Sequence, residues 1–275
     1  MRIAASNIAW DAPEDDAVAT LLGQYAIDAI DIAPTKYFQD PARTNDAAVS
    51  AVRNWWAERG FEVTGMQALL FGTKGLNVFG PPDVRAAMLG HLTAVCRIGQ
   101  LLGARRLVFG SPRNRDRSGL SDSETIAIAG EFFSRLGDIA SAHEVLICLE
   151  PNPPCYGANF MLNSAETAQV VAAIAHPAVR MQFDTGAMTV NKEAAEPVIS
   201  SFGRWVGHVH ASEPDLAPLG DGSCDHATIA RHLARALPGQ VVSIEMVATK
   251  NEPHLASLER AVQVAVRHYR APGAA

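Results

Sequence analysis

Short apolar runs alternate with longer helical patterns eight times along this chain, and this alternation is the strongest constraint on its fold. The runs that predict strands are Ile3–Ala9, Ile27–Ile32, Phe61–Leu69, Arg106–Gly110, Val145–Glu150, Val179–Asp184, Trp205–Ala211 and Val241–Val247. The patterns that predict helices are Asp11–Gln24, Asp46–Arg59, Pro82–Leu102, Ser121–His143, a segment beginning near Ser164, Lys192–Phe202, a segment that Asp225 caps, and His254–Tyr269. Strands joined through helices form parallel, right-handed crossover units.

The eight units follow one another without a linker that would divide the chain. The 275 residues give about 34 residues per unit, and no Pro-, Gly- or Ser-rich stretch separates two halves. Eight such units close a (β/α)₈ barrel, so the sequence predicts an α/β protein with one TIM-barrel domain over residues 1–275 and a short flexible tail from about residue 271. A doubly wound sheet is the alternative, but the segment SNIAWD after the first strand lacks the glycine fingerprint of that fold.

Charge and cysteine usage exclude several classes of protein. Lys and Arg number 23 against 29 Asp and Glu, a formal net charge of −6, whereas nucleic-acid binding needs a basic surface. No apolar run reaches the roughly 18 residues that a membrane span requires, and the N-terminal sequence reads as a strand and not as a signal peptide. Four cysteines without CxxC spacing are typical of reduced thiols. We therefore expect a cytoplasmic protein that binds neither nucleic acid nor membrane.

Acidic and histidine side chains stand at the ends of the last four predicted strands. These residues are Glu150, Asp184, His210 and Glu245. In a TIM barrel the strand ends meet at the face where active sites lie, and unpaired charge is unfavourable there because the strands are buried. One divalent ion would satisfy all four groups; a salt-bridge network with Arg or Lys is the alternative. Hard oxygen ligands favour Mn²⁺, Mg²⁺ or Co²⁺, and Zn²⁺ ranks lower because it prefers nitrogen and sulfur.

The same four residues lie in segments with a recognisable pattern. The segments are LEPNP around Glu150, QFDTG around Asp184, GHVHASE around His210 and SIE at Glu245, together with LLGARRLVFGSP and PLGDGSCDH. This set resembles the sugar phosphate isomerase/epimerase family of xylose isomerase-like barrels, which includes ketose 3-epimerases, hydroxypyruvate isomerase, inosose dehydratase and, more remotely, endonuclease IV. The resemblance implies that the four residues bind one divalent metal ion, Mn²⁺ first, and that Glu150 and Glu245 also move protons.

Two positions differ from the ketose 3-epimerases. Those enzymes usually carry a histidine three residues after the metal-binding aspartate and an arginine six residues after the metal-binding histidine. This chain has Ala187 and Leu216 at the two places. Both positions contact substrate in those enzymes, so the resemblance implies the metal chemistry and leaves the sugar unspecified.

The resemblance also implies a mechanism, proton transfer through a metal-bound enediolate. The ion would bind a carbonyl and an adjacent hydroxyl oxygen of the substrate, one glutamate would take a proton from carbon, and the second would lie on the opposite face. We therefore expect an isomerase or epimerase of a sugar or sugar phosphate. Three alternatives remain: a dehydratase of an inosose-like keto-polyol, an endonuclease IV-like phosphodiesterase, and a barrel that binds a ligand without catalysis.

Other side chains near the strand ends are candidates for binding the substrate. They are His208, Glu213, Arg113, Tyr156 and Lys250. His208 shares a strand face with His210, and Glu213 follows in the next loop. The aromatic residues after strand ends, which would wall the pocket, are Trp10, Tyr37, Phe71 and Tyr156.

Cationic side chains follow several of the strands. They are Lys36, Lys74, Arg113, Arg115, Arg117 and Lys250. Such groups suit a phosphate or carboxylate, because each contact is a charge-assisted hydrogen bond. The expected partner is therefore a small carbohydrate, free or phosphorylated, and the sequence leaves open whether the protein is a monomer or a homo-oligomer.

Overall fold

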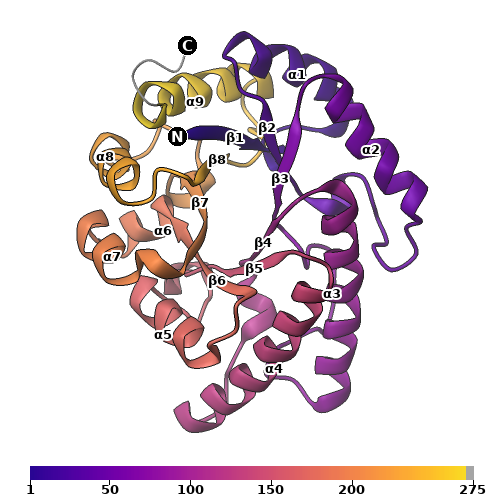
Figure 1. Ribbon diagram of the computed structural model, residues 1–275. Helices are drawn as coiled ribbons and strands as arrows, with labels where there is room; N and C mark the ends of the chain where they lie inside the picture. Colours follow the sequence, from indigo (N-terminus) through magenta and orange to yellow (C-terminus); the bar gives the residue numbers. More distant parts are fainter. Residues whose placement is uncertain (271–275) are drawn as a thin grey trace.

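The first and last strands pair with each other, which closes the sheet into a barrel (Figure 1). The computed structural model describes residues 1–270. Its strands are β1 (Arg2–Ser6), β2 (Ala29–Ile32), β3 (Glu62–Met66), β4 (Arg106–Phe109), β5 (Leu146–Leu149), β6 (Val179–Asp184), β7 (Val206–Ser212) and β8 (Val241–Glu245). Each strand runs parallel to its neighbours, and the order around the barrel is the order in sequence. The predicted (β/α)₈ barrel is confirmed, because a doubly wound sheet would have two edge strands.

Helices connect the strands and surround the barrel, as Figure 1 shows. They are α1 (Asp15–Gln24), α2 (Asp46–Glu58), α3 (Pro82–Leu102), α4 (Asp122–Ala142), α5 (Ser164–Ile174), α6 (Thr185–Val190), α7 (Ala195–Phe202), α8 (His226–Ala236) and α9 (His254–Tyr269). The sequence patterns miss α6, because six residues are too few to show an apolar period. They also begin the next helix at Lys192, three residues before the observed start of α7.

Side-chain caps fix where two of these helices begin. The hydroxyl of Ser121 accepts a hydrogen bond from the N–H of Glu124, whose carboxylate accepts one from the N–H of Ser121; this is the predicted capping box of α4. A carboxylate oxygen of Asp225 accepts the N–H of Thr228 at the start of α8. Both caps satisfy N–H groups that a helix leaves unpaired. They therefore define the ends of the loops that follow β4 and β7.

Some predicted strands extend too far at their C-terminal ends. The predicted ends Ala9, Leu69 and Val247 are wrong, because β1, β3 and β8 end three, three and two residues earlier. After β1 the chain turns into a short 3₁₀ helix, where the side-chain oxygen of Asn7 accepts the N–H of Ala33. The apolar runs continue because Ile8, Leu69 and Val247 line a cavity at the mouth of the barrel. A run of apolar residues can therefore extend beyond the last hydrogen-bonded residue of its strand.

Other expectations concern the whole chain. Within residues 1–270 the four cysteines form no disulfide. No helix in that range combines the length and the apolarity needed to cross a membrane. The tail predicted from about residue 271 lies outside the described residues.

Candidate metal centre and active site

The ends of the last four strands bring four ligand side chains to one point. Glu150 directly follows β5, Asp184 ends β6, His210 lies within β7, and Glu245 ends β8. Asp184 is in register with His210, and Glu245 with Ser212. One ligand atom from each of the four predicted residues lies within 4.8 Å of the other three. The barrel therefore gathers these groups at the carboxyl ends of its strands, where TIM barrels carry their chemistry.

A ring nitrogen faces three carboxylates in this cluster. The Nδ1 atom of His210 lies 3.1 Å from Oε2 of Glu245, 3.7 Å from Oε1 of Glu150 and 3.9 Å from Oδ2 of Asp184. The imidazole is fully buried and the three carboxylates are nearly so. The four side chains thus point at a common centre, with little water to separate them.

Crowded carboxylates shift the protonation of the cluster. Burial raises the pKa of Asp184 well above its usual value, and the charges of Glu245 and Glu150 raise it further. Burial alone would lower the pKa of His210, but the charge of Glu245 and the close approach of the Glu245 and Glu150 carboxylates raise it well above the usual value. The protein on its own thus carries more negative charge at this point than the low-dielectric interior favours.

The donor set fits a divalent cation. Three carboxylates and one imidazole offer hard oxygen and borderline nitrogen ligands, the set that Mn²⁺, Mg²⁺ and Co²⁺ accept. A doubly charged ion would leave the four residues with a net charge of about −1, which relieves the repulsion between Asp184 and the two glutamates. The four residues that the structure brings together therefore fit the divalent ion that the sequence predicts they bind.

Hydrogen bonds from the protein orient each carboxylate. Nε2 of Gln67 donates to Oε1 of Glu245 at 2.7 Å. Nδ2 of Asn152 donates to Oε2 of Glu150 at 3.1 Å. For Asp184, the hydroxyl of Ser212 lies 3.0 Å from both oxygens and the N–H of Ala187 donates to Oδ1 at 2.7 Å. Such partners fix which oxygen faces a metal ion and usually affect its affinity.

Arg115 supports the end of β5 from inside the protein. Its guanidinium is fully buried and donates to the backbone oxygen of Glu150 at 2.7 Å and to Oδ1 of Asn152 at 2.6 Å. Burial lowers the pKa of Arg115 to about 10. The sequence groups this residue with the exposed cations of its loop, and that grouping is wrong because the loop folds Arg115 inward. Arg115 holds Glu150 and Asn152 in place and is not free to bind an anion.

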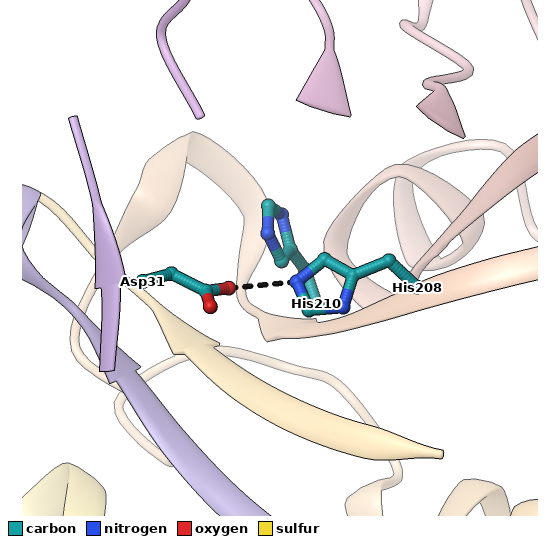
Figure 2. Close-up of side chains that lie close together, drawn as sticks. All are labelled: Asp31, His208 and His210. Carbon is teal, nitrogen blue, oxygen red and sulfur yellow. Dashed lines mark hydrogen bonds and ion pairs between the residues drawn. The ribbon is translucent and has the colours of Figure 1, made fainter. Parts of the chain in front are cut away.

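A buried acid and two imidazoles lie side by side in the barrel interior (Figure 2). Nε2 of His208 on β7 lies 2.7 Å from Oδ2 of Asp31 on β2. The hydroxyl of Thr64 donates to the other oxygen of Asp31 at 2.8 Å. The rings of His208 and His210 meet edge to face with centroids 5.2 Å apart. His208 is therefore fixed next to His210 by a partner on a strand across the barrel interior.

Two cavities meet at the cluster. The first, of about 520 Å³, is largely apolar and is called the aliphatic cavity; residues that define it include Ile8, Leu69, Phe71, Val108, Leu216 and Val247. The second, of about 400 Å³, is called the polar cavity; residues that define it include Asn152, Tyr156, Asp184, Glu213 and Asp215. Glu150 and Glu245 line both cavities. A substrate that bridges the two cavities would place its central atoms at these two carboxylates.

The predicted substrate-binding residues fall into two groups. Tyr156 and Glu213 line the polar cavity. His208, Arg113 and Lys250 line neither cavity: His208 is buried beneath the site, and the other two are exposed on loops. Among the predicted aromatic walls, Phe71 lines the aliphatic cavity, whereas Trp10 is fully buried.

Glu213 organises the loop that covers the polar cavity. Its carboxylate accepts the N–H groups of Gly220 at 2.9 Å and Cys224 at 3.0 Å, and Nε2 of His226 lies 3.0 Å from Oε1. Gly222 lies so close that a side chain there would overlap this carboxylate. Glu213 thus ties the loop after β7 to the start of α8.

Several supporting residues carry little signal in the sequence. They are Asp31, Gln67, Asn152 and Ser212. The only strong signal among them is Asp31, a charged residue in the middle of the apolar run AIDI. The amides and the hydroxyl follow no period, so only the folded geometry reveals their partners.

Comparison with known proteins decides the family. A sequence model described as "Xylose isomerase-like TIM barrel" matches residues 19–270. The chain belongs to the xylose isomerase-like TIM barrels. No curated protein matches its sequence. Among solved structures, D-psicose 3-epimerase in the presence of D-fructose superposes with a TM-score of 0.81 and 16% identity, covering 98% of this chain and 100% of that one.

Two further solved structures have a similar fold. L-ribulose 3-epimerase gives a TM-score of 0.80 at 17% identity, with coverage of 98% of this chain and 94% of that one. The 3-keto-D-glucoside 4-epimerase from E. coli, in its apo form, gives 0.78 at 15% identity, with coverage of 96% and 98%. At these identities the likeness establishes the fold, and the chemistry has to be argued from this barrel's own residues.

Proposed function

We propose that this protein is a divalent-metal-dependent isomerase or epimerase of a small carbohydrate. The observation that carries the proposal is the cluster of Glu150, Asp184, His210 and Glu245, with ligand atoms within 4.8 Å of one another where two cavities meet. The names of the similar structures, which are sugar epimerases, support the same reaction class.

The four clustered residues would hold one divalent ion, with Mn²⁺ first, Mg²⁺ and Co²⁺ next, and Zn²⁺ last because nitrogen and sulfur ligands are few. When bound, such an ion polarises a substrate carbonyl and offsets the negative charge that develops on its oxygen. Asp184 and His210 serve as ligands in this proposal, since Asp184 is held by Ser212 and the N–H of Ala187.

Glu150 and Glu245 are the groups that would move protons. Both carboxylates line both cavities, so each can reach a carbon atom at the junction. One glutamate would remove a proton from the carbon next to the carbonyl. A proton returned to that carbon from the opposite face by the other glutamate would invert its configuration, and a proton returned to the neighbouring carbon would interconvert aldose and ketose. The hydrogen bonds from Asn152 and Gln67 hold one oxygen of each carboxylate and leave the other directed at the centre.

The cationic side chains near this site are either engaged by the protein or outside the two cavities, which favours an uncharged substrate. Arg115 is bonded to the protein on two sides, and Arg113 and Lys250 line neither cavity. Lys36 does line the aliphatic cavity, but its ammonium donates to the backbone oxygen of Trp10 at 2.6 Å and to Asp11 at 3.1 Å. A comparison of free sugars with their phosphates tests this point: a phosphate that raises kcat/KM would contradict it.

Deuterium uptake tests the proposed reaction even when the product has not been identified. The protein is incubated with Mn²⁺ and a panel of ketoses, inososes and glycosides in D₂O, and incorporation at carbon is followed by NMR and mass spectrometry. We expect deuterium in at least one substrate, with Glu150→Gln and Glu245→Gln each reducing exchange at least 10²-fold. Glu196→Gln, an exposed change on α7, is the matched control.

Product mass separates the two reactions that share this first step. Isomerisation conserves mass, whereas a dehydratase loses water. If no carbohydrate in the panel gains deuterium, or if both glutamine variants keep near-normal exchange, the proposed function is wrong.

A further inference from the structure

The cluster of Glu150, Asp184, His210 and Glu245 lies at the border between two cavities that differ in their lining side chains. In the polar cavity, Asn152, Tyr156 and Asp215 present amide, hydroxyl and carboxylate groups. In the aliphatic cavity most of the wall is hydrocarbon. Besides Glu150 and Glu245, the polar side chains of that wall are Thr35, Lys36, Gln67 and Ser111. The last three already donate to protein acceptors, namely Trp10 with Asp11, Glu245 and Asn114, which leaves the hydroxyl of Thr35 as the remaining side-chain donor there. A polyol that filled the aliphatic cavity would leave many of its hydroxyl groups without partners.

Exposed apolar side chains gather at the mouth of the site. Among residues 1–270, four large hydrophobic side chains are exposed: Phe71 by 71%, Ile126 by 50%, Val247 by 45% and Tyr156 by 37%. Phe71 and Val247 line the aliphatic cavity and Tyr156 lines the polar one. Clustered apolar exposure of this kind is typical of ligand sites. The aliphatic cavity continues from Phe71 and Val247 to the carboxylates of Glu150 and Glu245, so a substrate held at these carboxylates could extend over the exposed side chains.

Leu216 stands between the two cavities on a restrained loop. It lines both of them. Leu216 and its neighbour Asp215 have φ values of 54° and 59°, a left-handed conformation that residues other than glycine rarely adopt. The backbone oxygen of Leu216 accepts the N–H of Val247 at 3.1 Å, and the N–H of Asp215 donates to the hydroxyl of Tyr156 at 2.8 Å. The fold thus holds a hydrocarbon side chain in a strained position next to the reacting groups, where it would contact substrate.

We propose that the substrate is a carbohydrate that carries an apolar substituent, such as an alkyl or aryl group, with its polyol portion in the polar cavity and the substituent in the aliphatic cavity against Leu216, Phe71 and Val247. This inference rests on the proposed function for the position of the reacting atoms. The substituent would contact the hydrocarbon of the aliphatic cavity, whose wall offers few hydrogen-bond partners to a polyol.

Binding of matched probes tests the substrate class. Affinities of the Mn²⁺-loaded protein are measured by calorimetry for methyl, hexyl and phenyl β-D-glucopyranosides, and for 6-O-methyl and 6-O-hexyl D-fructose, so that the substituent is offered at either end of the sugar. A fully buried methylene is worth about fourfold in affinity. We therefore expect the hexyl or phenyl member of at least one series to bind at least tenfold more tightly than its methyl counterpart.

Two variants test whether a gain in affinity from the hexyl or phenyl group arises in the aliphatic cavity. The double change Phe71→Ser with Val247→Ser is expected to reduce the gain to less than threefold, and its exposed positions leave the core intact. Ile126→Ser is the matched control, because Ile126 is the exposed hydrophobic residue on α4 that lines neither cavity. It should keep the full gain.

Three results would overturn the inference. The first is equal affinity for all members of both series, and the second is a gain in affinity that the double variant keeps. The third is that the wild-type protein sediments as an oligomer whereas the double variant sediments as a monomer. The third result would mean that a second copy of the chain covers Phe71 and Val247. Deuterium uptake keeps this test separate from that of the proposed function. Tight binding of hexyl or phenyl probes without exchange in any carbohydrate supports the inference and contradicts the function, whereas exchange with no apolar gain does the reverse.

Discussion

The imidazole of His208 and the carboxylate of Asp31 are joined by a contact of 2.7 Å across the interior of the barrel. Burial alone would raise the pKa of Asp31, but the charge of His208 and its hydrogen bond outweigh that effect and lower the pKa to about 2. The pair therefore places a carboxylate in the interior of the protein, shielded from bulk solvent. Such a group is stable only while its partners are present.

Loss of this carboxylate should destabilise the whole barrel. For Asp31→Ala we expect a decrease of about 3–5 kcal/mol in the free energy of unfolding, because His208 and Thr64 both lose a buried partner. Urea denaturation measures it. The control is Asp28→Ala, which removes an exposed ion pair with Arg2 and should cost at most about 1 kcal/mol. Equal effects would show that the buried pair contributes no more than a surface one.

Glu213 should make stability depend on pH in the acid range. Burial alone would raise its pKa, but hydrogen bonds from His226 and from the N–H groups of Cys224 and Gly220 lower it to about 2. Because the folded pKa lies below the unfolded one, the stabilisation is present above about pH 4.5 and is lost as the pH falls towards 2. The difference of roughly 2.5 pKa units corresponds to roughly 3 kcal/mol.

The test is the gap in unfolding free energy between wild type and Glu213→Gln. We expect this gap to shrink between pH 4.5 and pH 2.5, since Glu213 becomes protonated there in the unfolded chain, whereas the folded protein holds it largely ionised. The exposed change Glu58→Gln on α2 provides the baseline. A gap that stays constant with pH would contradict the lowered pKa.

Position 110 should tolerate only glycine. A Cβ atom on Gly110 would overlap the carboxylate of Glu150, so Gly110→Ala has to displace that carboxylate, which is a ligand in the proposed function. We expect Mn²⁺ affinity to fall by about 10–100-fold, the usual effect of disturbing a metal ligand's surroundings. Gly130→Ala on α4 is the control, because a Cβ there meets nothing within 4 Å. Calorimetric titration with Mn²⁺ compares the two, and unchanged affinity in Gly110→Ala would rule out Glu150 as a ligand.

Gln67 should influence the reaction through Glu245. Gln67→Leu keeps the size of the side chain and removes the 2.7 Å hydrogen bond to a carboxylate oxygen. A hydrogen bond to a charged group is worth about 1.5–3 kcal/mol, so kcat/KM for deuterium exchange should fall about 10–100-fold. In the control, Gln263→Leu removes an exposed hydrogen bond to Tyr25 and should leave exchange unchanged. Normal exchange in Gln67→Leu would mean that Glu245 needs no such support.

The sequence predicts the barrel and the four residues that cluster at its strand ends because both follow from short-range patterns. The apolar runs, the capping residues Ser121 and Asp225, and the charged residues at strand ends are all local features. Parallel closure then places Glu150, Asp184 and Glu245 at one face without any further information.

What surrounds those positions depends on contacts between distant segments. Gln67 and Glu245 are 178 residues apart, and Asp31 and His208 are 177 apart. No periodicity links such pairs. Arg115 is an example of the opposite error: it lies in a loop with the cations Arg113 and Arg117, yet the turn after β4 directs it inward to Glu150. The periodicity of the sequence therefore does not predict which distant residues form hydrogen bonds, or the direction in which a side chain in a loop points.

Asp184 is at once a member of the cluster and the N-cap of α6, since its Oδ1 accepts the N–H of Ala187. Occupancy of the centre and order in this six-residue helix are thus linked thermodynamically. A cation that draws electron density from Asp184 weakens the cap, whereas proton loss from the same carboxyl strengthens it. Because Ala187 lines the polar cavity, the amide exchange rate of one residue would report how the centre is loaded, even when no substrate is turned over.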